Sequence, residues 1–297
     1  MTSVLLLVAM ILSMASCGGS TESKDVVKTI AIPLTEEEYA FAVQKGDTEL
    51  LKQLNDFLAE ITANGKFAEV VNKYFGDGTP EPVASAKQMK NDGSQLIVAT
   101  NAAFAPFEYM VGENFYGLDM ELMSMFAAKL GKELYISNMD FDAVCLSVSS
   151  AGGTYENEDG TVVSVTGGSC NIAAAGLTVS DTRKEILDFS TSYYNASQVL
   201  IVPEDNHEFD DCKTAKDVED ILNKKDKTTK VGTQNGTTGY FYATGDEDWG
   251  FDGFKFETVG FANGALAVQA MINGNIQIVI IDEGPAKEIV KNMNAAN

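Results

Sequence analysis

The sequence predicts an α/β protein of two units, and three observations support this fold class. Hydrophobic residues make up 45% of the 297 positions, enough to fill a sizeable core. From residue 95 onward, short apolar runs alternate with longer amphipathic stretches, which is the pattern of consecutive β-α-β units. A second series of the same kind starts at residue 230, and the apolar run at residues 198–203 joins the two series.

The elements of the first unit follow one another in a regular order. The strand QLIVAT precedes the helical stretch GLDMELMSMFAAKLG, and then come the strand KELYISN, the amphipathic FDAVCLSV and the strand CNIAAAG. Residues 149–169 interrupt this order as a surface insertion, in which Asp159 and Gly160 lie between two alternating stretches and predict a β-hairpin turn. The second unit alternates in the same way, from KVGTQNG to GPAKEIVKNM.

Two helices are predicted upstream of the first unit. Residues 47–63 carry an N-cap at Asp47 or Thr48 and end before Gly65. Their apolar stripe consists of Leu50, Leu51, Leu54, Phe57, Leu58 and Ile61. Residues 66–75 continue as a second helix, and helices this short need a core to pack against. Residues 77–94 are rich in Gly, Pro, Ser and Asp and predict a linker.

The composition argues against several classes of function. The net charge of −22 gives an acidic surface, which disfavours a nucleic-acid partner. Three cysteines follow residue 17 without CxxC spacing, and His207 is the only histidine, so we expect no metal site, no cofactor and no Ser-His or Cys-His catalysis. Cys145 and Cys170 either form a disulfide in an oxidising exterior or are two small buried apolar side chains.

The N-terminus predicts export from the cell. Residues 4–12 form an apolar run that is too short to span a bilayer as an ordinary helix and is typical of a signal peptide. The run ends in Met-Ala-Ser-Cys, which resembles a bacterial lipobox. That resemblance implies a signal peptide over residues 1–16, a lipid on Cys17 and a lipid-anchored tether over residues 17–25. The alternative interpretation is a buried N-terminal strand or helix.

A family resemblance extends over roughly residues 95–290. The segments LIVATNAAFAPFEY, GLDMEL, MDFDAV and NIAAAGLTVSDTRKEILDFSTSYY resemble, in this order, the first lobe of the extracytoplasmic solute-binding proteins of family 3, the amino-acid-binding proteins of ABC importers. The segments VGTQNGTTGYFY and AVQAMINGNIQIVIIDEG resemble their second lobe. The resemblance implies a periplasmic-binding-protein fold, in which two α/β lobes are joined by a two-strand hinge (type II). Phe126 departs from the family, which usually has a smaller aliphatic residue in this helix.

Arg183 is the only arginine in the chain, beside twenty lysines. A guanidinium group offers a rigid fork that matches a carboxylate with two hydrogen bonds, which lysine cannot reproduce. Arg183 is therefore predicted to bind a carboxylate, and the alternative is a chance surface arginine. The resemblance adds Thr178, Thr237 and Thr238 as further carboxylate donors. It also implies that the Gly176 carbonyl and the Asp282 carboxylate bind an ammonium group, whereas a solvated acid at a strand end is the other interpretation of Asp282.

Four further residues correspond to positions that contact the ligand side chain in relatives. They are Asn101, Phe104, Phe141 and Gln234, although a phenylalanine taken alone is more often a core residue. Asn101 and Gln234 are neutral where relatives carry aspartate or lysine. A neutral polar amino acid is therefore favoured, a basic one stays open through cation–π contact with the two rings, and glutamate and aspartate are the least expected.

The order of segments departs from the family. Residues 26–76 resemble the C-terminal part of a family member, yet here they precede the first lobe, and the chain stops where that part should begin. A circular permutation predicts a first lobe made of residues 34–76 and 95–200, a linker over residues 77–94, and a second lobe made of residues 26–33 and 201–297. A fused remnant of a neighbouring gene is the alternative.

These features together predict a non-enzymatic lipoprotein anchored outside the cytoplasm, at the cell surface or in the periplasm. It is expected to bind a free amino acid in the cleft between its lobes and to deliver it to the permease subunits of an ABC-type importer. Two alternatives stay open because fold alone does not decide function: a dehydratase acting on prephenate or arogenate, and the ligand-sensing subunit of a signalling complex.

Overall fold

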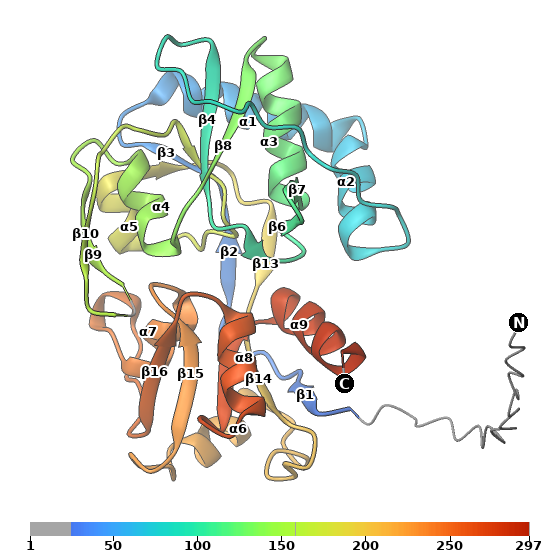
Figure 1. Ribbon diagram of the computed structural model, residues 1–297, viewed down its shortest axis with the longest axis vertical. Helices are drawn as coiled ribbons and strands as arrows, with labels where there is room; N and C mark the ends of the chain where they lie inside the picture. Colours follow the sequence, from blue (N-terminus) through green and yellow to red (C-terminus); the bar gives the residue numbers. More distant parts are fainter. Residues whose placement is uncertain (1–24, 158, 297) are drawn as a thin grey trace, which may run out of the picture.

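The computed structural model describes residues 25–157 and 159–296, which form two lobes stacked one above the other (Figure 1). Each lobe contains its own five-stranded sheet. The chain passes between the lobes along two segments that lie side by side. They contain β2 (Glu37–Tyr39) and β13 (Tyr194–Ala196), which pair antiparallel. The predicted α/β fold with two lobes and two connecting strands is confirmed.

The first lobe is built around a sheet with the strand order β12-β3-β11-β4-β8. Strands β11, β4 and β8 are parallel, and β3 runs antiparallel to both of its neighbours. The strands are β3 (Ala42–Gln44), β4 (Gln95–Thr100), β8 (Glu133–Asn138), β11 (Ile172–Ala173) and β12 (Leu187–Phe189). The helices are α1 (Thr48–Ala63), α2 (Lys66–Phe75), α3 (Leu118–Lys129), α4 (Phe141–Val148) and α5 (Asp181–Ile186).

The second lobe is built around a sheet with the strand order β1-β14-β17-β15-β16. Strands β17, β15 and β16 are parallel, and β14 runs antiparallel to both of its neighbours. The strands are β1 (Val27–Ile30), β14 (Gln198–Pro203), β15 (Lys230–Gln234), β16 (Glu257–Phe261) and β17 (Ile278–Asp282). The helices are α6 (Ala215–Leu222), α7 (Thr238–Thr244), α8 (Gly264–Ile272), α9 (Glu283–Ala295) and the short 3₁₀ helix η1 (Glu247–Trp249).

Two smaller sheets extend the first lobe toward the second. One consists of β5 (Ala103–Phe104), β6 (Glu108–Val111) and β7 (Asn114–Tyr116). The other is the hairpin of β9 (Gly153–Glu156) and β10 (Val162–Val165), and it confirms the turn predicted at Asp159 and Gly160.

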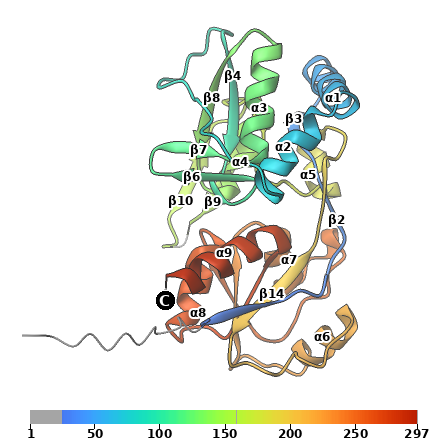
Figure 2. The same cartoon turned by 90° about the vertical axis from the view of Figure 1, so that its right-hand side faces the viewer.

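The N-terminal segment contributes to both lobes. Strand β1 lies beside β14 in the second lobe (Figure 2), with Val27 opposite Pro203. Strand β3 is inserted between β11 and β12 of the first lobe, and α1 and α2 follow it there. The amide oxygen of Asn294, near the end of α9, accepts hydrogen bonds from the backbone amides of Val26 (2.9 Å) and Val27 (3.1 Å). Residues at opposite ends of the described chain are thus neighbours.

Helix α1 forms for the reasons that its sequence suggested. The Asp47 carboxylate accepts from the Leu50 amide at 3.1 Å, so it caps the N-terminus. Gly65 adopts a left-handed conformation just after the helix. Four residues of the predicted stripe are buried: Leu54, Phe57, Leu58 and Ile61. The predicted cap, stripe and end of α1 are confirmed.

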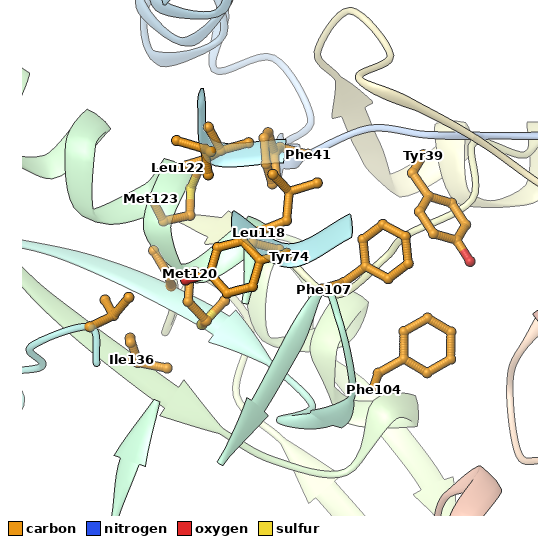
Figure 3. Close-up of a cluster of buried hydrophobic side chains, with 14 of the residues drawn as sticks. Tyr39, Phe41, Tyr74, Phe104, Phe107, Leu118, Met120, Leu122, Met123 and Ile136 are labelled. Carbon is orange, nitrogen blue, oxygen red and sulfur yellow. The ribbon is translucent and has the colours of Figure 1, made fainter. Parts of the chain in front are cut away.

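Helix α3 is buried on more sides than an amphipathic surface helix, because α1 and α2 cover it from outside (Figure 1). Phe126, the residue that departs from the family, is fully buried and packs on Phe57 with ring centroids 5.3 Å apart. Figure 3 shows the adjoining core, in which Phe107 lies between the α3 side chains and the rings of Tyr39 and Phe104 near the second lobe. This core therefore extends to the surface that faces the other lobe.

The segment over residues 77–94 has no regular structure, but it is attached to the first lobe rather than a free coil. Val83 is buried and forms a β-bridge with Phe115. Farther along, the Ser85 hydroxyl accepts from the Ile136 amide at 2.9 Å. The composition of this segment suggested a flexible linker. Composition cannot reveal isolated contacts such as the β-bridge of Val83 and the hydrogen bond of Ser85.

The predicted signal peptide and the lipid site at Cys17 lie outside the described residues. Within residues 25–157 and 159–296, no helix combines the length and the hydropathy that crossing a bilayer requires.

Candidate functional site

Nine of the ten predicted ligand-binding residues line one cavity between the lobes. They are Phe104, Phe141, Gly176, Thr178 and Arg183 of the first lobe, and Gln234, Thr237, Thr238 and Asp282 of the second. The cavity is nearly closed, with a volume of about 10 Å³, and it lies where parallel strands of both sheets end, which is the usual place for ligands in α/β folds. The structure thus brings together residues that are up to 178 positions apart in the chain, from 104 to 282.

Arg183 is buried and points its guanidinium group across the gap between the lobes. It lies in the first turns of α5, whose N-cap Ser180 accepts from the Arg183 backbone amide at 3.2 Å. One guanidinium nitrogen donates to the Thr178 carbonyl at 2.7 Å, and the other donates to the Gly236 carbonyl of the second lobe at 3.1 Å. The alternative of a chance surface arginine is therefore wrong.

Two aromatic rings flank the Arg183 guanidinium. Its central carbon is 5.5 Å from the centroid of Phe141 and 5.0 Å from that of Trp249, which belongs to η1 of the second lobe. These distances are within the range of cation–π attraction. The sequence analysis missed Trp249, although its being the only tryptophan in the chain was a visible signal.

Threonine hydroxyls connect the lobes beside Arg183. The Thr238 hydroxyl donates to the Thr178 hydroxyl at 3.1 Å, and this in turn donates to the Glu37 carboxylate at 2.7 Å. Glu37 lies on the connecting strand β2 and is 7% exposed. Its carboxylate also accepts from the side-chain amide of Gln198 at 2.9 Å. Glu37 was not predicted, because the N-terminal segment that carries it reaches the site only through the tertiary fold.

Asp282 ends β17 and is buried, so the alternative of a solvated strand-end acid is wrong. The Tyr39 hydroxyl of the connecting strand donates to its carboxylate. Burial and the nearby Glu37 carboxylate raise the pKa of Asp282 to about 7, although the hydrogen bonds from Tyr39 and Gln198 act in the opposite direction. An ammonium group at this position would favour the ionised form of Asp282.

Gly176 is supported from behind by a pair of fully buried acids. Its amide donates to the Asp119 carboxylate at 3.0 Å, and the Tyr193 hydroxyl donates to the same oxygen at 2.8 Å. Burial raises the pKa of Asp119 to about 7, and burial together with Asp119 raises the pKa of Glu108 well above its usual range. Burial and the neighbouring carboxylate thus favour the protonated form of Glu108.

The conformation of Gly176 requires the absence of a side chain. Its φ of +50° lies in the left-handed region, and an added Cβ would be 2.9 Å from the Phe104 ring. The close approach leaves the polar backbone of Gly176 at the cavity wall.

Asn101 is the predicted site residue that does not line this cavity. Its amide nitrogen donates to the Met139 carbonyl at 2.8 Å, and its oxygen accepts from the Gln234 amide at 3.1 Å. Asn101 and Gln234 thus form a neutral amide pair across the two lobes, with Gln234 at the cavity and Asn101 behind it.

A wider acidic opening lies next to the cavity on the other side of Phe141. It has a volume of about 290 Å³ and is lined by Asp140, Phe141, Asp142, Tyr155, Asn157, Asp159, Asn235 and Ala262. The hairpin insertion contributes Tyr155, whose hydroxyl donates to Asp140 at 2.7 Å. Burial and the charge of Asp140 raise the pKa of Asp142. The insertion therefore forms one wall of an acidic opening.

Cys145 and Cys170 are free thiols in the structure, which corrects the disulfide considered above. Both pack in the apolar cluster between α4 and the first sheet, but in different surroundings. The Cys145 thiol lies near Arg183, whereas the Cys170 thiol lies near the side chains of Ser137, Ser147 and Ser169. Burial raises the pKa of both thiols, and the alternative of two small core side chains describes them.

Two α/β lobes that enclose a polar cavity at the ends of their parallel strands define a two-lobed binding protein of the periplasmic type. In comparison with known families, residues 10–77, 96–152 and 155–283 match the bacterial extracellular solute-binding proteins, family 3. These residues are well over half of the chain, so the chain belongs to this family.

Individual relatives are similar over part of their length. The probable histidine-binding protein of Neisseria gonorrhoeae is 27% identical over 209 residues, which are 70% of this chain and 66% of that protein. The arginine-binding extracellular protein ArtP of Bacillus subtilis is 30% identical over 121 residues, which are 39% of this chain and 41% of that protein. The chain spans less than two thirds of either relative. Among solved structures, holo ArgBP from T. maritima is 27% identical with a TM-score of 0.50, over 67% of this chain and 74% of that chain.

Proposed function

We propose that this protein binds a free amino acid outside the cell in the cavity between its lobes and delivers it to an ABC-type importer. The observation that carries this proposal is the convergence on one cavity of a buried guanidinium from the first lobe and a buried carboxylate from the second. An amino acid presents the complementary pair of charges, a carboxylate and an ammonium group. The relatives named for histidine and arginine support the same class of ligand.

Each charged group of the ligand has partners in this proposal. The carboxylate binds Arg183, with Thr178, Thr237 and Thr238 as further donors. Their hydroxyls must first turn away from Glu37, the Gln234 carbonyl and Thr178, to which they donate in the structure. The ammonium group binds Asp282 and the carbonyl of Gly176, while Phe104 and Phe141 contact the side chain. The lobes separate and close about the two connecting segments to admit the ligand. The lipid on Cys17 would keep the protein beside the permease.

A thermal-shift screen of the purified protein with the twenty amino acids tests this function. An amino acid at a hundred times its dissociation constant should stabilise the fold by about 2.7 kcal/mol. The D-enantiomer of the best ligand is the matched control, because fixed partners for both charged groups distinguish the two mirror images. If no amino acid raises the melting temperature, the proposed function is wrong. Turnover of prephenate would instead support the dehydratase. Recovery of a signalling partner, rather than a permease, would support the ligand-sensing subunit.

We further propose that the ligand side chain is polar and that basic side chains are accepted. The neutral Asn101–Gln234 pair suits a neutral polar group, as the sequence suggested. The acidic opening beyond Phe141 and the relatives named for arginine and histidine favour a positive charge. Glutamate and aspartate are disfavoured because their second carboxylate would approach Asp140 and Asp142.

Replacing Asn101 by aspartate tests the selectivity. Asn101→Asp places a negative charge behind Gln234, so we expect the affinity for arginine relative to glutamine to rise about tenfold. Competition against one labelled ligand measures this ratio, and Asn91→Asp controls for the change in net charge, because Asn91 is exposed and lines neither the cavity nor the acidic opening. An unchanged ratio would mean that Asn101 does not influence the ligand side chain.

We also propose that the chain is a circular permutation of the usual family order, with the lobe and linker boundaries predicted above. The pairing of β1 with β14 supports this proposal, as does the insertion of β3 between β11 and β12. The contact of Asn294 with Val26 supports it too, since the permutation makes these residues the ends of an ordinary helix-to-strand loop. A fused remnant of a neighbouring gene is not expected to complete the sheets of both lobes.

A reordered chain tests the permutation. In it, residues 95–297 are followed directly by residues 26–76, which restores the family order and removes residues 77–94. We expect ligand affinity to match that of the parent protein, because no contact around the cavity is lost. The melting temperature should fall, since Val83 no longer covers apolar surface of the first lobe. Failure of the reordered chain to fold, while the parent folds and binds, would contradict the proposal.

A further inference from the structure

The only arginine and the only tryptophan of the chain lie against each other although they belong to different lobes. The Arg183 central carbon is 5.0 Å from the centroid of the Trp249 ring. The chain has twenty lysines and many other aromatic rings, so this pairing of two unique residues is not explained by composition. Any hinge motion that separates the lobes must break the contact.

Trp249 is held firmly on its own lobe. The Asp246 carboxylate caps η1 by accepting from the Trp249 amide at 3.2 Å, and Asp246 and Phe251 exchange backbone hydrogen bonds of 2.8 and 3.0 Å around the turn. The indole stacks on Phe241 with centroids 5.1 Å apart and planes at 20°. Trp249 therefore reaches the first lobe from a rigid support rather than from a free loop.

Arg183 receives two contacts from the second lobe at once. Besides the face of Trp249, the carbonyl of Gly236 accepts a hydrogen bond from its guanidinium group at 3.1 Å. The lobes approach closely here, since a Cβ added at Gly236 would lie 2.3 Å from a carboxylate oxygen of Asp142. A guanidinium fork binds a carboxylate well only in a fixed orientation, and these contacts fix it.

We propose that Trp249 is a positioning residue that packs over Arg183 as the lobes close, orients its guanidinium group for the ligand carboxylate, and slows opening once the ligand is bound. This rests on the proposed function, since it assigns Arg183 to a ligand carboxylate. Trp249 acts through Arg183 and is not among the residues lining the cavity. A purely structural tryptophan would stabilise the second lobe without affecting ligand release.

Affinity and dissociation rate of three variants test the proposal, with L-arginine, L-histidine and L-glutamine as probes. Trp249→Ala should weaken the tightest probe about tenfold through faster dissociation, whereas Trp249→Phe, which keeps a ring face, should retain most of the affinity. Phe254→Leu is the matched control, because Phe254 packs on Tyr242 and Phe256 in the same lobe and has no ring contact with Trp249. It should bind like the wild type.

The fluorescence of the single tryptophan provides a second readout in the unaltered protein. Saturation with the tightest probe should reduce quenching of Trp249 by acrylamide, because closure brings the indole against Arg183. If the wild type binds a probe but quenching is unchanged and Trp249→Ala binds equally well, the positioning role is overturned and the proposed function stands. If no amino acid binds the wild type, both are overturned.

Discussion

Arg183→Lys should lower the affinity for the amino acid about a hundredfold while the protein stays folded. The guanidinium group donates to carbonyls of both lobes and is flanked by two rings, so its plane is fixed when the lobes are closed. An ammonium group keeps the charge and can still form a charge-assisted hydrogen bond, but it loses the paired, parallel hydrogen bonds that a guanidinium fork makes to a carboxylate. Titration calorimetry on wild type and variant measures the difference.

The neighbouring lysine supplies the control for this prediction. Lys184 is exposed and bonds to Asp181 within α5, so Lys184→Gln changes the same helix without approaching the cavity. It should bind like the wild type. If Arg183→Lys and the wild type bind with near-equal affinity, then Arg183 does not bind the ligand carboxylate.

The alternating strands and helices could be predicted because local periodicity and turn residues determine them. The N-cap at Asp47 and the hairpin at Asp159 and Gly160 are examples in which a few neighbouring residues decide the structure. The attachment of residues 77–94 to the first lobe could not be predicted, since it depends on pairing of Val83 with Phe115, thirty-two positions away. Patterns within one segment carry no information about such contacts.

The gathering of nine residues around the cavity could be predicted because they lie within motifs of the family. Glu37, Tyr39 and Trp249 could not, for a physical reason. Glu37 and Tyr39 lie on the strand that connects the lobes and meet Thr178 and Asp282 only after both sheets have formed. Trp249 meets Arg183 only when the lobes are close together. Residues that act between lobes have no local signature.

Asp282 should make amino-acid binding depend on pH. Its pKa in the folded protein is raised to about 7, first by burial and then by the Glu37 carboxylate. An ammonium ligand pairs with the ionised carboxylate, so binding below pH 7 must first release the proton from Asp282. Affinity should be greatest above pH 7 and fall about tenfold for each pH unit below it. Calorimetry in buffers of different ionisation enthalpy would detect the released proton.

Asp282→Asn should weaken amino-acid binding without lowering the stability of the fold. A carboxyl whose folded pKa is raised above the unfolded value of 3.8 destabilises the fold increasingly as the pH rises from about 4 to about 7, and fully above that. Asparagine removes this buried charge, so at pH 8 the protein without amino acid should melt at the same or a higher temperature. The affinity should nevertheless fall about a hundredfold, because the ammonium group loses its charged partner.

The pH profile of the variant distinguishes Asp282 from the other buried acids. Asp119 also has a pKa of about 7 and bonds to the Gly176 amide, so some dependence on pH should remain after Asp282 is neutralised. The steep part below pH 7 should disappear in Asp282→Asn. If the variant binds as tightly as the wild type at pH 8, or keeps the full steepness, then the ammonium group is bound elsewhere and the raised pKa of Asp282 has no part in ligand capture.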